Sequence, residues 1–283
     1  MSWGLVLGSG GLRGAAHVGF LKVLEENNIR PPLIAGTSAG AVVAALYASG
    51  LSPSKIEQQI SMIYKTLSMG SMLEKFTSAS KLTKARMEKL PMGFLSGITA
   101  EFILKNLLKN KDFSRLSIPC SIVATDLNSG ETVVFSNKKY APRSQNTVYI
   151  DRTKVAEAVR ASMGIPVLFE PKEIYGRMLI DGGVTNSVPV DIVMDMGAQK
   201  VIAVDLDISG RSPENLFGVI FKTIDIMAFY VSQSKPYKAD LTVKPHMPKA
   251  GLLDIDKIPQ LIAAGEQAAV KNLKMIKKII SHI

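Results

Sequence analysis

Residues 33–48 read LIAGTSAGAVVAALYA, and this stretch decides the fold. The short apolar run Leu33–Ala35 predicts a buried strand, and the alanine-rich run Ala39–Ala48 predicts a helix. Between them lies a GxSxG motif at residues 36–40. A serine between strand and helix sits on a strained turn that exposes its hydroxyl. We therefore predict that Ser38 is a nucleophile, with a helix N-cap as the alternative role.

The start of the chain shows the same strand, loop and helix order. Gly4–Leu7 predicts a strand and Ala15–Leu24 a helix, with glycines between them. Two β/α units within 50 residues indicate a parallel sheet covered by helices. The pattern returns after residue 118, with strands predicted at Ser121–Thr125, Thr132–Phe135, Met178–Ile180, Val201–Asp205 and Leu241–Val243, and helices at about Lys154–Ser162, Val190–Met196 and Ile258–Ile280.

The glycine-rich loop at residues 8–14, GSGGLRG, is the second chemical signal. Consecutive glycines leave backbone N–H groups that point into an anion-binding concavity, suited to a phosphate or a tetrahedral oxyanion. A dinucleotide site is the alternative, but the GxGxxG spacing fails at Arg13 and no acidic ribose ligand follows the second strand. An oxyanion hole beside Ser38 explains both loops together.

A serine hydrolase also needs a base. The three histidines are His17, His246 and His282, and only His246 has a plausible topological position for a triad. Asp181 is the better candidate, because it ends a predicted strand and two glycines clear space after it. A simple turn made by Asp181 with those glycines is the alternative.

Residues from about 52 to 110 differ in composition from the rest of the chain. They are polar and rich in lysine, with methionines at 62, 69, 72, 87 and 92. We interpret this segment as a helical insertion in a single domain that spans residues 1–283. Methionine adapts to irregular apolar ligands, which favours a lid or an acyl-chain wall. Ordinary core packing of helices is the alternative.

The chain has a formal net charge of +10, which favours attraction to anionic surfaces such as phospholipid headgroups. The sequence has no basic stripe interleaved with aromatic residues, so it does not indicate nucleic-acid binding. Cys120 is the only cysteine, so a reducing compartment is expected. The N-terminus does not resemble a signal peptide, and Leu216–Val231 is too short and too charged for a bilayer span, so we predict a buried or membrane-surface helix there.

Five motifs, in order and in spacing, resemble those of the bacterial patatin-like phospholipase family. They are GSGGLRG at 8–14, GTSAG at 36–40, ATDLNSGE at 124–131, ASMGIPVLFEP at 161–171 and DGGVTNSVPV at 181–190. The resemblance covers nearly the whole chain and is weakest in the insertion. It implies a three-layer α/β/α fold with a mainly parallel central sheet, and lipid acyl hydrolysis by a Ser/Asp dyad without histidine.

Carried over by motif, Ser38 resembles the nucleophile and Asp181 the base. The backbone amides of Gly10, Gly11 and Arg13 resemble the oxyanion hole. The family usually has glycine where this chain has Ser9, which would be strained if that position required a positive φ. Supporting positions are the motif glycines Gly36, Gly40, Gly182 and Gly183, together with Ser162 and Pro166, which hold the chain near the dyad.

The expected protein is therefore a serine lipid acyl hydrolase of the phospholipase A or lysophospholipase/esterase type. Its expected substrate is a phospholipid or another fatty-acyl ester, with no metal and no cofactor required. The expected location is the cytoplasm, with peripheral contact to the anionic inner membrane face. The alternative is a lipid-surface or protein-binding module with weak or vestigial activity, and the oligomeric state stays open.

Overall fold

The computed structural model describes residues 2–67, 93–95, 97–206, 216–248, 250 and 254–281. Within these residues the chain forms one large sheet with the strand order β11-β10-β1-β2-β4-β5-β6, and β9 pairs with both β4 and β8. A separate two-stranded sheet joins β3 and β7. The strands are β1 (Trp3–Leu7), β2 (Leu33–Thr37), β3 (Gly93–Leu95), β4 (Cys120–Asp126), β5 (Thr132–Phe135), β6 (Thr147–Ile150), β7 (Val167–Phe169), β8 (Lys172–Ile174), β9 (Arg177–Asp181), β10 (Lys200–Val204) and β11 (Leu241–Val243).

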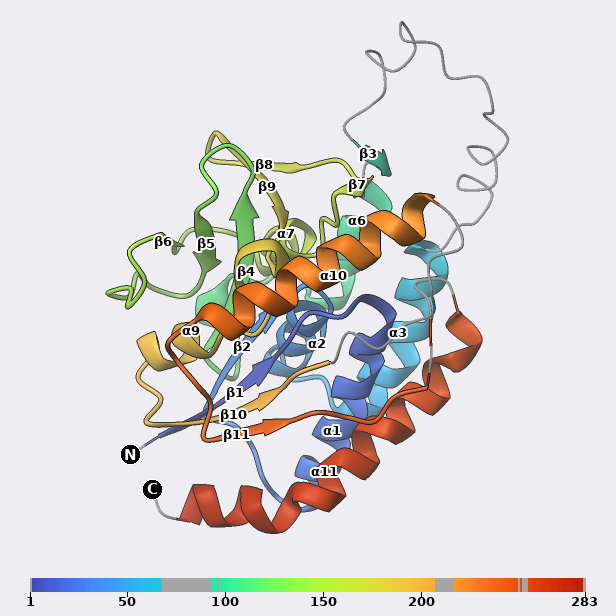
Figure 1. Ribbon diagram of the computed structural model, residues 1–283, viewed down its shortest axis with the longest axis vertical. Helices are drawn as coiled ribbons and strands as arrows, with labels where there is room; N and C mark the ends of the chain where they lie inside the picture. The colour runs from blue at the N-terminus through green and yellow to red at the C-terminus, as the bar shows by residue number, and fades with distance from the viewer. Residues whose placement is uncertain are drawn as a thin grey trace, which may run out of the picture.

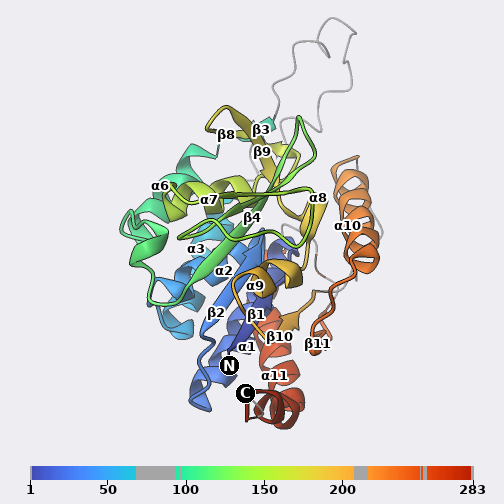
Figure 2. The same ribbon diagram turned by 90° about the vertical axis from the view of Figure 1, so that its left-hand side faces the viewer.

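Helices cover both faces of this sheet (Figures 1 and 2). In β1, Leu5 and Leu7 join a large apolar core with α1, α2, α7 and α11, whereas Val6 joins a smaller core with α9 on the opposite face. Period-two alternation of a strand buried on both faces produces this division. The helices are α1 (Ala15–Glu26), α2 (Ala39–Ala48), α3 (Pro53–Leu67), α6 (Ile98–Leu107), α7 (Val155–Ser162), α8 (Gly183–Asn186), α9 (Val190–Asp195), α10 (Leu216–Ser234) and α11 (Ile258–Ser281).

The expected mixed fold with a mainly parallel sheet is confirmed. The strands β11, β10, β1, β2 and β4 run parallel, and β5 and β9 pair antiparallel with β4. Because β1 and β2 are parallel neighbours, with Leu7 opposite Gly36, the glycine loop and the GxSxG turn leave the same edge of the sheet. Parallel pairing therefore places the two sequence signals side by side.

The proposed insertion begins and ends in helices. Ile56, Ile60 and Ile63 of α3 are buried in the main core, and α3 packs against α1, so this helix belongs to the body of the domain. Met62 is 45% exposed, and the methionines at 69, 72, 87 and 92 lie outside the described residues.

Helix α10 coincides with the expected apolar helix at Leu216–Val231. It crosses the front of the molecule in Figure 1 and lies apart from α1 and α2 in Figure 2. Within the described residues, no helix is both long enough and apolar enough to span a membrane.

Candidate active site

Ser38 forms the tight turn between β2 and α2. Its backbone has φ 55° and ψ −120°, a region that non-glycine residues rarely adopt and that costs on the order of 1–3 kcal/mol. Gly40, in the first turn of α2, has no room for a side chain, because an added Cβ would collide with the carbonyl oxygen of Leu7. Gly36 is equally confined, since its Cβ would meet the backbone of Gly40. The two glycines let the strained turn close against the end of β1.

A buried serine from another motif holds this turn. The Ser38 backbone N–H donates to Ser162 Oγ at 2.9 Å, and the Ser162 hydroxyl donates to the carbonyl of Val123 at 2.5 Å. Ser162 ends α7 and is fully buried. Its single hydroxyl therefore ties the Ser38 turn to β4, which gives the ASMG motif a positioning role.

Asp181 ends β9, next to β4, where it lies opposite Ala124. Its Oδ2 accepts the Ser38 hydroxyl at 2.5 Å, and its Oδ1 accepts the Gly183 backbone N–H at 2.7 Å. Gly182 must lack a side chain, because a Cβ there would collide with the Val123 carbonyl oxygen. The structure thus brings the two residues expected to form a dyad into direct contact.

The Asp181 carboxyl is 5% exposed, and this burial raises its pKa to about 6. Hydrogen bonds from Ser38 and Gly183 act in the opposite direction, and the negative charge of Asp225 adds to the increase in the pKa. At neutral pH the carboxylate is therefore mostly ionised and is a stronger base than an ordinary aspartate.

The glycine loop presents free amides near this dyad. Neither the Gly10 nor the Gly11 N–H has an acceptor within the described part of the chain, whereas the Arg13 N–H donates to the Gly10 carbonyl at 3.1 Å. The positive φ falls at Gly11, at 55°, and not at Ser9. Serine is therefore unstrained at position 9, where the motif usually has glycine.

Three side chains hold the carbonyl groups of the loop. Arg13 Nε donates to the Gly10 carbonyl at 3.1 Å, and the Tyr64 hydroxyl donates to the Gly11 carbonyl at 2.5 Å. His17 Nε2 lies 2.8 Å from the Gly8 carbonyl. Burial lowers the pKa of His17 to about 4, so the ring is neutral and Nε2 must carry the proton to donate. In a trans peptide the N–H points away from the carbonyl of the same peptide group, so the Arg13 contact with the Gly10 carbonyl orients the Gly11 N–H. The Tyr64 and His17 contacts fix the peptide groups on either side.

Similarity to known proteins identifies the family of this chain. The family model described as Patatin-like phospholipase matches residues 5–194, which include both loops, Ser38 and Asp181. The chain belongs to the patatin-like phospholipase family. Membership is consistent with a lipid acyl hydrolase.

Two relatives and one solved structure illustrate the match. The chain is 32% identical over 218 residues to patatin-like phospholipase domain-containing protein 6 of Homo sapiens, covering 76% of this chain and 14% of that protein. It is 32% identical over 209 residues to an uncharacterized NTE family protein of Mycobacterium tuberculosis, covering 74% of this chain and 50% of that protein. VipD from Legionella pneumophila shares the fold, with a TM-score of 0.52, 15% identity and coverage of 97% of this chain and 67% of that chain.

Among the described residues, an ion pair and a hydrogen bond join helix α10 to the site of this patatin-like chain. The Arg13 guanidinium forms an ion pair with Asp225 at 2.8 Å, and the Ser187 hydroxyl donates to the Ala228 carbonyl at 3.2 Å. Arg13 therefore bridges the glycine loop and α10. Its side chain has a clear structural role, although the motif assigned only its backbone amide.

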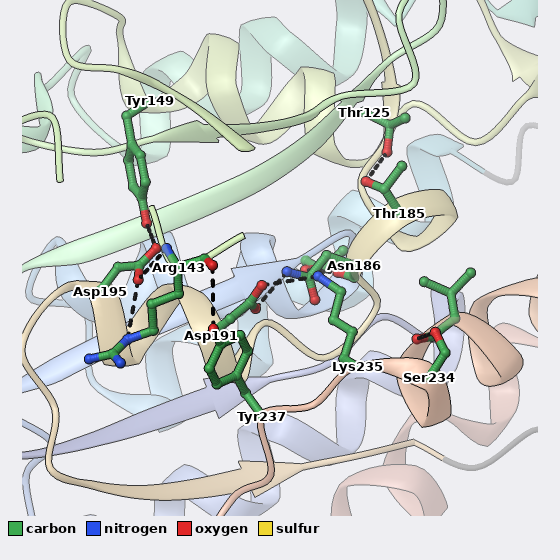
Figure 3. A network of polar contacts seen from close by, with 12 residues as sticks. Thr125, Arg143, Tyr149, Thr185, Asn186, Asp191, Asp195, Ser234, Lys235 and Tyr237 are labelled. Carbon is green, nitrogen blue, oxygen red and sulfur yellow. Dashed lines mark hydrogen bonds and ion pairs between the residues drawn. The ribbon is translucent and has the colours of Figure 1, made fainter. Parts of the chain in front are cut away.

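A polar network secures the end of α10 (Figure 3). Lys235 Nζ and Asn186 Nδ2 both donate to the buried Asp191 carboxylate, at 3.0 and 2.8 Å. The Asn186 carbonyl accepts the Thr37 hydroxyl at 2.8 Å, one residue before Ser38. The network thus continues from the end of α10 to Thr37, the last residue of β2 before the Ser38 turn.

The histidine alternatives lie differently. His246 is exposed after β11 and forms no hydrogen bond with Ser38 or Asp181, and His282 lies outside the described residues. Sequence reasoning missed Tyr64 and Asp225. Both reach the site through tertiary contacts from helices far along the chain, and no local pattern marks such residues.

Proposed function

We propose that this protein is a serine lipid acyl hydrolase in which Ser38 is the nucleophile and Asp181 the base. The observation that carries the proposal is the 2.5 Å hydrogen bond from a strained, buried serine hydroxyl to a carboxylate whose pKa is raised to about 6. An activated nucleophile needs a base within hydrogen-bond reach and with a pKa near the working pH.

In the first half of the reaction, Asp181 accepts the proton of the Ser38 hydroxyl while Oγ attacks the ester carbonyl carbon. The carbonyl oxygen becomes an oxyanion. When this intermediate collapses, the ester C–O bond breaks and the leaving alcohol takes the proton from Asp181. An acyl-serine remains.

In the second half, water replaces the alcohol. As the water oxygen attacks the acyl carbon, Asp181 accepts one proton from the water. Asp181 then returns that proton to Ser38 Oγ as the bond between Oγ and the acyl carbon breaks. The fatty acid leaves and the dyad is restored. Because the same carboxylate serves both halves, one titrating group governs the acid side of the pH profile.

For the oxyanion hole we propose the amides of Gly10 and Gly11, which have no acceptor in the described part of the chain. Arg13 contributes through its side chain, because its own N–H is held by the Gly10 carbonyl. One such donor is worth about 3 kcal/mol in the transition state.

The proposed substrate is a phospholipid or another fatty-acyl ester, hydrolysed as by a phospholipase A or a lysophospholipase. Family membership supports the lipid class, and the net charge of +10 favours anionic headgroups. Activity in the cytoplasm, at the inner membrane face, is the proposed setting, and the buried Cys120 thiol fits a reducing compartment.

The test is covalent labelling with a fluorophosphonate, which mimics the acyl transition state, followed by mass spectrometry. We expect an adduct on Ser38, slower labelling of Asp181→Asn, and no adduct on Ser38→Ala. His246→Ala is the matched control and should label like the wild type. Loss of labelling in that control would support a triad, and the absence of any adduct would support the lipid-binding module without hydrolysis.

A further inference from the structure

Helix α10 carries an exposed apolar stripe. Val219, Ile226, Met227 and Tyr230 are 49%, 42%, 51% and 68% exposed. At about 100° per residue these positions fall on one side of the helix. Asp225 and the buried Ala228, which contact the catalytic region, fall on the opposite side. One face of α10 thus rests on the site while the other presents large apolar side chains to solvent.

The stripe lies close to the catalytic loop. Asp225 is paired with Arg13, which binds the Gly10 carbonyl, so a single side-chain bridge separates α10 from the proposed oxyanion hole. A helix with its side chains is about 10–12 Å across. The stripe is therefore separated from the loop proposed to act on the ester by about one helix diameter and the Arg13–Asp225 bridge.

The charges of α10 suit an anionic lipid surface. Lys222 and Asp225 are the only charged residues of the helix, and Asp225 points to Arg13. The stripe therefore carries no carboxylate that would repel phosphate headgroups. Apolar side chains on a helix that lies in the interface plane, on a protein with a positive net charge, are the features of peripheral membrane binding.

A second copy of the chain is a poorer occupant. A stable dimer buries about 800 Å² on each partner. Four partly exposed side chains on a single helix supply only part of that area. An ester substrate held in a bilayer, by contrast, must reach a site beside this helix.

We propose that the α10 stripe of Val219, Ile226, Met227 and Tyr230 is the surface by which this protein docks on a phospholipid membrane. This inference rests on the proposed lipid hydrolase function, because docking would bring the site to its lipid substrate. Membrane binding itself does not require catalysis. Docking through α10 holds the Ser38 site on the membrane-facing side of the molecule, directly beneath this helix, within reach of an acyl ester that leaves the bilayer surface.

The test measures binding without hydrolysis, in the Ser38→Ala background, by cosedimentation with vesicles of phosphatidylcholine and phosphatidylglycerol. We expect Ile226→Ser/Tyr230→Ser to weaken partitioning at least ten-fold, because two apolar side chains leave the interface. The matched control is Val270→Ser/Met275→Ser on α11, whose side chains are 60% and 49% exposed and which lies on another side of the molecule (Figures 1 and 2). This control should partition like the parent.

A second measurement places the helix in the bilayer. Tyr230→Trp adds a second tryptophan to the native Trp3, which is buried in the main core, and brominated lipid should quench the new emission. The proposal would be overturned if Ile226→Ser/Tyr230→Ser partitioned like the parent, or if the α11 control lost as much binding. It would also be overturned if the parent were a dimer that only the α10 substitutions convert to a monomer.

The two proposals fail separately. If the hydrolase assignment is wrong, Ser38 takes no adduct and α10-dependent vesicle binding persists. If docking is wrong, Ile226→Ser/Tyr230→Ser hydrolyses vesicle lipid as fast as the wild type. If both hold, that variant loses activity on vesicles but keeps it on a soluble short-chain ester.

Discussion

Replacing Asp181 with asparagine should stabilise the protein at neutral pH while abolishing turnover. Burial raises the pKa of Asp181 from 3.8 to about 6, so the native state binds its proton more tightly than the unfolded chain does. Between pH 4 and pH 6 the free energy of unfolding therefore falls as the pH rises. At about 1.4 kcal/mol for each pH unit, the ionised carboxylate costs about 3 kcal/mol of stability above pH 6.

Asparagine removes that penalty and keeps most of the geometry. Its side-chain oxygen can accept the Gly183 N–H, and its amide can donate to Ser38 Oγ, where the carboxylate now accepts. The Ser38 hydroxyl proton then loses its acceptor, which costs about 1 kcal/mol. We expect a net gain of about 2 kcal/mol at pH 7.5.

Urea unfolding at a series of pH values between 4 and 8 measures this difference. The advantage of Asp181→Asn should shrink as the pH falls below 6 and disappear between pH 4 and 5, where the native carboxyl is protonated and the pH approaches the unfolded pKa of 3.8. Asp112→Asn is the control, because its side chain is half exposed in an ion pair with Lys154 and should change stability little. A difference that stays constant with pH, or a less stable Asp181→Asn protein at pH 7.5, would refute the reasoning.

Three further outcomes follow from the same contacts. Ser38→Gly should be about 1 kcal/mol more stable than Ser38→Ala in thermal unfolding, because glycine relieves the positive φ and alanine keeps it; equal stability would argue against strain. Tyr64→Phe should lower kcat by up to ten-fold with little change in KM, because the loop loses the hydrogen bond that fixes Gly11, the residue whose N–H is a proposed oxyanion donor, and a change in KM alone would contradict this. Asp225→Asn should shift the acid limb of the pH profile of kcat, which is centred near pH 6, to slightly lower pH, because a negative charge that raises the pKa of Asp181 is removed. A shift to higher pH would contradict this.

The residues that meet at the candidate site could be predicted from the sequence because their patterns are local. The turn at Ser38 needs glycine where the neighbouring chain passes, and Asp181 needs glycine after its strand, so both leave a pattern of adjacent residues. Parallel pairing of β1 with β2 then joins the two loops without further information. These are properties of short segments and of one sheet rule.

The parts that escaped prediction depend on distant contacts or on weak local patterns. Strand β6, at Thr147–Ile150, follows a polar loop and is recognisable only once it pairs with β5. Tyr64 looks like any core residue of an amphipathic helix until its hydroxyl meets the Gly11 carbonyl. Asp225 interrupts an apolar helix for a reason that appears only when Arg13 lies beside it.

The same features that weaken the fold at this site support the proposed chemistry. A carboxylate surrounded by water would hold its proton too weakly to accept one from serine, so burial must raise its pKa, and burial in turn destabilises the ionised native state. The strained Ser38 backbone adds a second cost. The structure offsets both with hydrogen bonds that fix the position of each group, from Ser162 to the turn and from Gly183 to the carboxylate. Replacing the proposed base Asp181 with asparagine should therefore release stability, whereas removing a residue that positions the site, such as Ser162, should lose stability and activity together.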